Sequence, residues 1–198
     1  MALDPAGPGG RSSTLRMDAL SSSIMRTPIA VALLLAAVSA FGQGGTQLPD
    51  RTPSPRWQRV VSEDNRFSVS MPGTPAFKTQ TLTAKNGHPV QFSSYTVDLG
   101  TRAYMASYSD YDAQTAVSLD GAVEGVLSSW KEPCIVSRRR ATLYGHPAVI
   151  VDFVSQDYRV VVRAFAAGRR LYQLGFVETS AGFLPAHAEA FMGSFRLR

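Results

Sequence analysis

The residues best suited to nucleophilic chemistry in this sequence are one cysteine and three histidines. Cys134 is the chain's only cysteine, and His88, His146 and His187 are its histidines. A thiol nucleophile needs a neighbouring base, which a third group orients. Cys134 with His146 or His187 is therefore the minimal pair for a small hydrolase, which we keep as the alternative function. Because the Gly-x-Ser-x-Gly nucleophile motif is absent, we expect a non-enzymatic protein.

Two residue sets could ligate a metal ion, and neither has the usual spacing. The three histidines lie far apart in the sequence and lack the paired spacing of a zinc site. Asp110 and Asp112 offer oxygen ligands to a calcium ion, but without the longer acidic loop of a calcium site. Asp112 is equally suited to cap a helix. No Gly-rich phosphate loop follows a strand, so we expect neither metal nor cofactor, and a metal-dependent enzyme with an unrecognised site stays an alternative.

Arginines form the remaining candidate site. Arg138–Arg140 are consecutive, and Arg159 and Arg163 flank the position expected to oppose Asp152 on a neighbouring strand. Such a patch would attract an anionic lipid or polysaccharide, whereas the alternative is a cross-strand ion-pair cluster of small energetic effect. Alternate residues on a strand point to opposite faces, so Arg139 should oppose its two neighbours. The candidate binding residues are Arg138, Arg140, Arg159 and Arg163.

The N-terminal region predicts export. Residues 25–40 combine Arg26, a short apolar run and a small-residue end at Ser39-Ala40, which is the pattern of a secretory signal peptide. The run is shorter than the about 20 apolar residues of a membrane span. We therefore expect a periplasmic or secreted protein with no membrane span in the mature chain. Residues 1–24 are expected to be a non-native or disordered extension, 41–55 a linker and 56–198 a single domain.

Charge and cysteine content limit the partners. The formal net charge is +5 and is spread out apart from Arg138–Arg140. Nucleic-acid-binding proteins show a denser basic stripe, so we expect no nucleic-acid partner. One cysteine excludes an intrachain disulfide. The apolar neighbours of Cys134 indicate a buried thiol, and pairing between molecules is the alternative.

The elements that must position these residues are organised around residues 145–177. Period-two alternation there predicts an antiparallel meander with a two-residue turn at Gln156-Asp157 and a three-residue loop at 167–169. These two loops would bring nine apolar side chains to one buried face. They are Val149, Val151, Phe153, Val160, Val162, Ala164, Tyr172, Leu174 and Phe176.

Further strands and two helices complete the predicted fold. Strands are expected at 57–61, 67–71, 77–84, 90–99, 102–109 and 135–143, with a strong hairpin turn at Asn86-Gly87. Apolar residues at helical spacing predict amphipathic helices over about 115–131 and from Pro185 onward. The fold class is therefore α+β, with about six to eight antiparallel strands in two meanders packed with two helices.

Several motifs carry a resemblance to a known family. They are Phe67-Ser-Val-Ser-Met-Pro-Gly-Thr-Pro75, Leu119-Asp-Gly-Ala122, Arg170-Leu-Tyr-Gln-Leu174 and Phe191-Met-Gly-Ser-Phe195. Over roughly residues 57–197 the chain resembles the bacterial exported proteins related to PsbP and Mog1. The resemblance implies an α/β/α sandwich that serves as a binding or assembly module, and it supplies no catalytic residues. We therefore expect an exported, non-enzymatic module of the bacterial cell envelope whose partner is an envelope protein or a small ligand.

Overall fold

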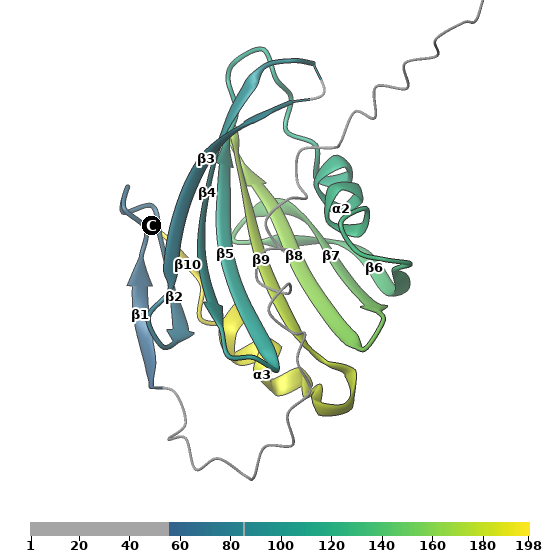
Figure 1. Ribbon diagram of the computed structural model, residues 1–198. Coiled ribbons are helices and arrows are strands. Elements are labelled where there is room, and N and C mark those ends of the chain that lie inside the picture. The colour runs from purple at the N-terminus through teal and green to yellow at the C-terminus, as the bar shows by residue number, and fades with distance from the viewer. Residues whose placement is uncertain (1–55, 85) are drawn as a thin grey trace, which may run out of the picture.

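The computed structural model describes residues 56–84 and 86–198 (Figure 1). The expected extension at 1–24, signal peptide at 25–40 and linker at 41–55 lie outside these residues. The described strands form two antiparallel sheets. The small sheet has the order β1 (Trp57–Val61), β2 (Phe67–Pro72) and β10 (Arg196–Leu197). The large sheet has the order β3 (Ala76–Thr83), β4 (Pro89–Asp98), β5 (Arg102–Asp110), β9 (Arg170–Thr179), β8 (Tyr158–Ala167), β7 (His146–Ser155) and β6 (Cys134–Leu143).

The pairing of β5 with β9 joins the two predicted meanders into one sheet of seven strands. Both strands are buried along nearly their whole length, because both faces of the sheet are covered. The helix α2 (Leu119–Leu127) lies against one face, with Val123 and Val126 among the valines of β7 and β8. The helix α3 (Pro185–Met192) and the small sheet cover the opposite face, and a short 3-10 helix, η1 (Ser180–Gly182), precedes α3. The predicted α+β class with two helices is confirmed.

An aromatic cluster fills the space between the small sheet, α3 and the large sheet. Phe67 of β2 stacks on Phe195 at a centroid distance of 5.1 Å, and Phe165 stacks on Tyr172 at 4.9 Å. Phe191 of α3 meets Tyr104 edge-on at 5.4 Å. These side chains join strands that are distant in sequence, so the core of this face forms only when both ends of the domain are in place.

The predicted register of the third meander strand is wrong. The turn between β8 and β9 has two residues, Gly168 and Arg169, and pairs Ala167 with Arg170. Gly168 has a φ of +62°, which suits the first central position of a tight hairpin turn. Compared with a three-residue loop, this turn sends Tyr172, Leu174 and Phe176 to the α3 face, while Val160, Val162 and Ala164 stay on the α2 face. The turn at Gln156-Asp157 and the pairing of Phe153 with Val160 are as predicted.

The first helix is shorter than predicted. It begins after Ser118, whose hydroxyl accepts a hydrogen bond from the Gly121 amide at 3.0 Å. Asp112, which the sequence suggested as a cap, contacts His88 instead. The helix ends at Leu127, and the next two serines donate their hydroxyls to carbonyls of the last turn. Such hydroxyl bonds satisfy carbonyls that have no partner within the helix.

A buried arginine connects the two sheets. Arg170 of β9 donates two hydrogen bonds of 2.6 Å to Asp110 and one to Asp64 in the turn between β1 and β2. Its guanidinium lies 4.3 Å from the centre of the Tyr108 ring. Burial raises the pKa of Asp64, but hydrogen bonds from Arg170 and Ser62 outweigh burial and leave that pKa below its usual value.

Candidate functional site

A cleft lies between α3 and the outer strands β6, β7 and β8 of the large sheet. Its volume is about 190 Å³. Its apolar surface comes from Ile150 and Val161 of the sheet, Phe183 before α3, and Pro185 and Ala188 of α3 itself. Charged side chains from both the strands and the helix line the same cleft. This combination of an apolar surface and converging polar groups is typical of a binding site.

Strand register explains why the charged residues meet. Arg139 of β6 pairs with Ile150 of β7, which pairs with Arg163 of β8, so all three side chains share one face. Asp152 lies opposite Val161, and Arg159 is its diagonal neighbour on the same face. The predicted proximity of Asp152 to both β8 arginines is therefore present.

The Arg159–Asp152 pair is fully hydrogen-bonded. The Arg159 Nε donates to Asp152 Oδ1 at 2.9 Å, and its Nη2 donates to Oδ2 at 2.7 Å. The Asp152 hydrogen bonds raise the pKa of Arg159. The same guanidinium lies 4.7 Å from the centre of the Phe183 ring. Both carboxylate oxygens of Asp152 are thus occupied within the protein, and this pair fixes one side of the cleft.

The other two cleft arginines keep unused donors. Arg163 donates from Nη2 to Glu189 of α3, while its Nε is buried without a hydrogen-bond partner. Arg139 is exposed and has no ion pair among the described residues. A buried N–H without an acceptor is unfavourable, so the Arg163 Nε is an unsatisfied donor in the wall of the cleft. The exposed Arg139 guanidinium is available to an acceptor that the protein itself does not supply.

The four arginines predicted as one patch are divided between the two faces of the sheet. Arg159 and Arg163 line the cleft, whereas Arg138 and Arg140 point to the α2 face. Arg138 contacts Asp120 at 2.9 Å and Glu124 at 2.6 Å, and Arg140 contacts Asp120 at 2.6 Å. These hydrogen bonds from Arg138 and Arg140 hold the pKa of Asp120 below its usual value. The cleft contains Arg139 instead, on the face opposite its two neighbours as alternation requires.

The candidate nucleophile and base are not brought together. Cys134 and His146 begin opposite ends of the β6–β7 hairpin, where Cys134 pairs with Val154 and His146 with Leu143. Nine residues of extended strand separate these ends by roughly 30 Å. His187 contacts Glu178 on β9. β9 lies three strand spacings from β6, so Glu178 is about 14 Å from Cys134. The thiol is exposed rather than buried, because β6 is the edge strand of the sheet.

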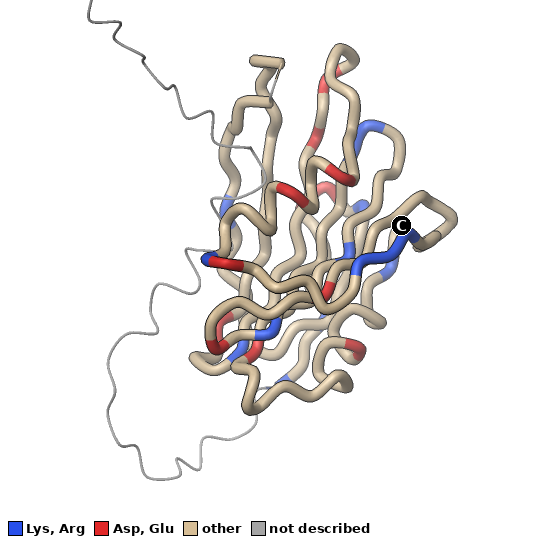
Figure 2. The backbone as a smooth tube through the Cα atoms, turned by 90° about the vertical axis from the view of Figure 1, so that its right-hand side faces the viewer, with Lys and Arg blue, Asp and Glu red and all other residues tan. Residues whose placement is uncertain are grey.

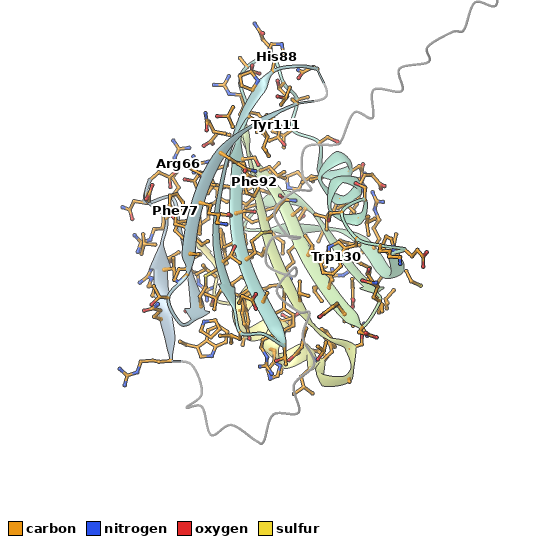
Figure 3. The ribbon with its side chains drawn as sticks, in the orientation of Figure 1. Arg66, Phe77, His88, Phe92, Tyr111 and Trp130 are labelled. Atoms are coloured by element: carbon orange, nitrogen blue, oxygen red, sulfur yellow. The ribbon has the colours of Figure 1, made fainter. Side chains whose placement is uncertain are left out.

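The candidate metal ligands also lie apart or are already paired. His88 is at the tip of the β3–β4 hairpin (Figure 3), where its Nδ1 contacts Asp112 at 2.7 Å. Hydrogen bonds from Thr115, and then from His88, hold the pKa of Asp112 below its usual value. Asp110 is paired with Arg170. Within residues 56–84 and 86–198, no group of His, Cys, Asp and Glu side chains is arranged to hold a metal ion.

The sequence alone did not predict Glu178 of β9, which holds the start of α3 in place beside the site. Glu178 is fully buried beside the cleft, where it pairs with Arg102 at 2.9 Å and His187 at 3.1 Å. It also accepts the Leu184 amide at 3.2 Å, which fixes the start of α3. A glutamate in a central strand was the available signal, since a buried carboxylate needs partners.

The seven-stranded antiparallel sheet, covered by a helix on each face, has a PsbP-like α+β fold. It is similar to the solution structure of cyanobacterial PsbP (CyanoP) from Synechocystis sp. PCC 6803, with a TM-score of 0.51 and 9% sequence identity over 79% of this chain and 98% of that chain. A protein of unknown function from Pseudomonas aeruginosa, described as a putative regulator, has a TM-score of 0.37 and 14% identity over 68% of this chain and 90% of that chain. No family model and no curated protein matches the sequence. Among the described residues, no helix has the length and apolar character to cross a membrane.

Proposed function

We propose that this protein is an exported, non-enzymatic binding module of the bacterial cell envelope, and that the α3 cleft binds a ligand through an anionic group such as a carboxylate. The pattern of a signal peptide at 25–40 supports export. The PsbP-like fold supports a binding or assembly role by analogy. The separation of Cys134 from His146 and His187 removes the nucleophile–base pair that favoured a hydrolase.

The observation that carries the proposal is the surplus of hydrogen-bond donors in the cleft. Three guanidinium groups face two carboxylates there, and Arg139 and the Nε of Arg163 have no acceptor among the described residues. Guanidinium groups bind carboxylates through short, charge-assisted hydrogen bonds. The adjacent Ile150 and Val161 offer contact to an apolar group attached to that anion.

The size of the cleft limits what it holds. Its about 190 Å³ is smaller than the roughly 300–1,000 Å³ of pockets that enclose cofactors and drug-sized molecules. Charges of both signs are dispersed along the chain rather than gathered in a long basic stripe (Figure 2). A small acid or a single acidic side chain therefore fits the site better than a nucleotide or a nucleic acid.

Benzoate is a suitable probe because it joins a carboxylate to an apolar ring, and benzamide is its neutral counterpart of the same shape. In a ¹⁵N NMR titration of the purified protein, we expect benzoate to shift the amides of β6, β8 and α3. Benzamide should bind at least about tenfold more weakly, since a charged acceptor strengthens a hydrogen bond.

Variants of two arginines make this test specific. Arg139→Gln should weaken benzoate binding about tenfold, whereas Arg169→Gln, a change in the exposed β8–β9 turn, should leave it unchanged. Equal binding of benzoate and benzamide, or equal effects of the two variants, would show that the cleft is not an anion site.

Export has its own test, which does not depend on the ligand. Cells that produce the full chain should process it to a shorter form that fractionates with the periplasm or the medium, with cleavage after Ala40. Recovery of the uncleaved chain in the cytoplasmic fraction would contradict this part of the proposal.

A further inference from the structure

We infer that the natural ligand of the cleft is an acidic segment of a partner protein, which docks as an extended strand along the free edge of β6. This inference rests on the proposed anion site and names the partner that it serves. An added strand gains affinity from main-chain hydrogen bonds and specificity from its side chains. The β6 edge and the cleft are adjacent, so one segment can use both.

The first observation is an edge of β6 that no other described strand pairs with. β6 pairs with β7 on one side and is the last strand of the large sheet. Residues 134–140 are exposed without interruption. The register shift between Ile135 and Ser137 leaves Val136 outside the regular pairing, so the uninterrupted edge runs from Ser137 to Leu143. Unpaired main-chain groups along such an edge are a template for another strand.

The second observation is the position of Arg139 within this edge. Its side chain lines the cleft from β6, beside the open backbone. On a strand added next to β6, the residue opposite Arg139 points to the same face. An acidic residue at that position would therefore reach the unpaired Arg139 guanidinium at the mouth of the cleft.

The third observation is an apolar surface at the start of β6, just before this edge. Ile135 is 46% exposed and Val136 is 51% exposed. Apolar residues flanking the acidic position of a partner segment would cover them. Burial of such surface stabilises an interface in proportion to its area.

Charge selects an acidic partner over a second copy of this chain. Two copies paired through β6 about a two-fold axis at Arg139 would bring Arg138–Arg140 of each chain next to the same arginines of the other. Like charges directly opposite each other on paired strands are destabilising. The other free edge, β3, carries Lys78 as its single charged residue and lies at the opposite end of the sheet from the cleft.

The test uses the purified protein and the capped peptide Thr-Val-Glu-Val-Glu-Val-Thr, which places both glutamates on one face of a strand. Two control peptides are matched to it, one with lysine at both glutamate positions and one N-methylated at its central residues. We expect the acidic peptide to bind more tightly than benzoate and to slow hydrogen exchange of β6 amides. The lysine peptide and the N-methylated peptide should each bind at least about tenfold more weakly, because they lose the charge pair or the main-chain hydrogen bonds.

The outcomes separate this inference from the proposed function. Equal binding of the N-methylated and unmodified peptides, or peptide binding without protection of β6 amides, overturns strand docking while benzoate binding still supports the anion site. Binding of neither benzoate nor peptide contradicts both. A concentration-dependent dimer in which β6 amides become protected without peptide would make a second copy the occupant and would overturn the acidic partner.

Discussion

At the scale of single residues, Arg170 combines ion pairs with contacts to aromatic rings. It is buried, it pairs with two aspartates from different parts of the chain, and its guanidinium lies beside two tyrosine rings. Removal of one partner from a buried ion pair leaves uncompensated charge, which costs more than loss of an exposed pair. Asp64 and Asp110 are partly exposed, so water would compensate part of that cost.

We therefore expect Arg170→Met to lower the free energy of unfolding by about 2–3 kcal/mol. Urea denaturation monitored by tryptophan fluorescence measures this change. The control is Arg169→Met, which alters the exposed neighbour and should change stability by less than about 0.5 kcal/mol. Similar losses in both variants would mean that the Arg170 cluster has no special structural role.

The pairing of Asp64 with Arg170 predicts how the stability of the protein changes at low pH. Its pKa is lowered in the folded protein, so its contribution to stability is complete above the unfolded-state pKa of about 3.9 and is lost as the pH falls through the lower folded-state pKa. Asp64→Asn should therefore flatten the loss of stability between about pH 5 and pH 2. Chemical denaturation at a series of pH values provides the measurement, with the exposed Asp157→Asn as control. A pH profile unchanged from wild type would contradict the pairing with Arg170.

Local pattern predicted part of the site. The Arg159–Asp152 pair follows from hairpin register alone, because a two-residue turn fixes which residues are diagonal neighbours. Glu189 and Phe183 could not be placed, since the docking of α3 depends on contacts with β2 and β5 far away in sequence. The exposure of Cys134 was mispredicted because its apolar neighbours suggested burial, whereas the position of β6 at the sheet edge is a property of the whole topology.

At the scale of elements, the sequence predicted where the strands begin and end. It did not predict which face of the sheet the side chains of β9 occupy. Turn residues and alternation located every strand of the large sheet to within a few residues. The prediction of which side chains of β9 face α2 failed because this strand is buried on both sides, and alternation gives no register when both faces are buried. The single-residue difference between the predicted loop and the observed Gly168-Arg169 turn therefore moved three large side chains to the other core.

The α2 cap offers a test at this scale. Ser118→Ala removes the hydroxyl that accepts from the Gly121 amide and should destabilise the protein by about 1 kcal/mol. A thermal or urea unfolding curve detects a change of this size. Ser180→Ala is the matched control, because the Ser180 hydroxyl is exposed and has no hydrogen bond in the described structure. Equal stability of the two variants would show that α2 does not depend on this cap.

At the scale of the whole molecule, the two ends of the domain share one core. Phe195 stacks on Phe67 and also contacts Phe165 and Tyr172, so it bridges the small sheet and the large one. β10 then pairs with β2 and closes the small sheet. Residues separated by most of the domain thus depend on one another for burial.

Phe195→Ala should accordingly lower the free energy of unfolding by about 3–5 kcal/mol, as expected for loss of a buried aromatic side chain. Leu184→Ala, at an exposed position before α3, should cost far less. Calorimetry of both variants measures the difference. A small effect of Phe195→Ala would mean that the stability of the domain comes from the core between α2 and the large sheet alone.

The arrangement of β2 between β1 and β10 has a consequence for biosynthesis. A ribosome releases the chain from its N-terminal side, so Phe67 and Met71 emerge early, yet the aromatic ring that covers them is translated more than a hundred residues later. Until then the nascent segment has an uncovered apolar surface of the kind that chaperones bind. The small sheet and the aromatic core beneath it can therefore close only after translation has passed residue 197.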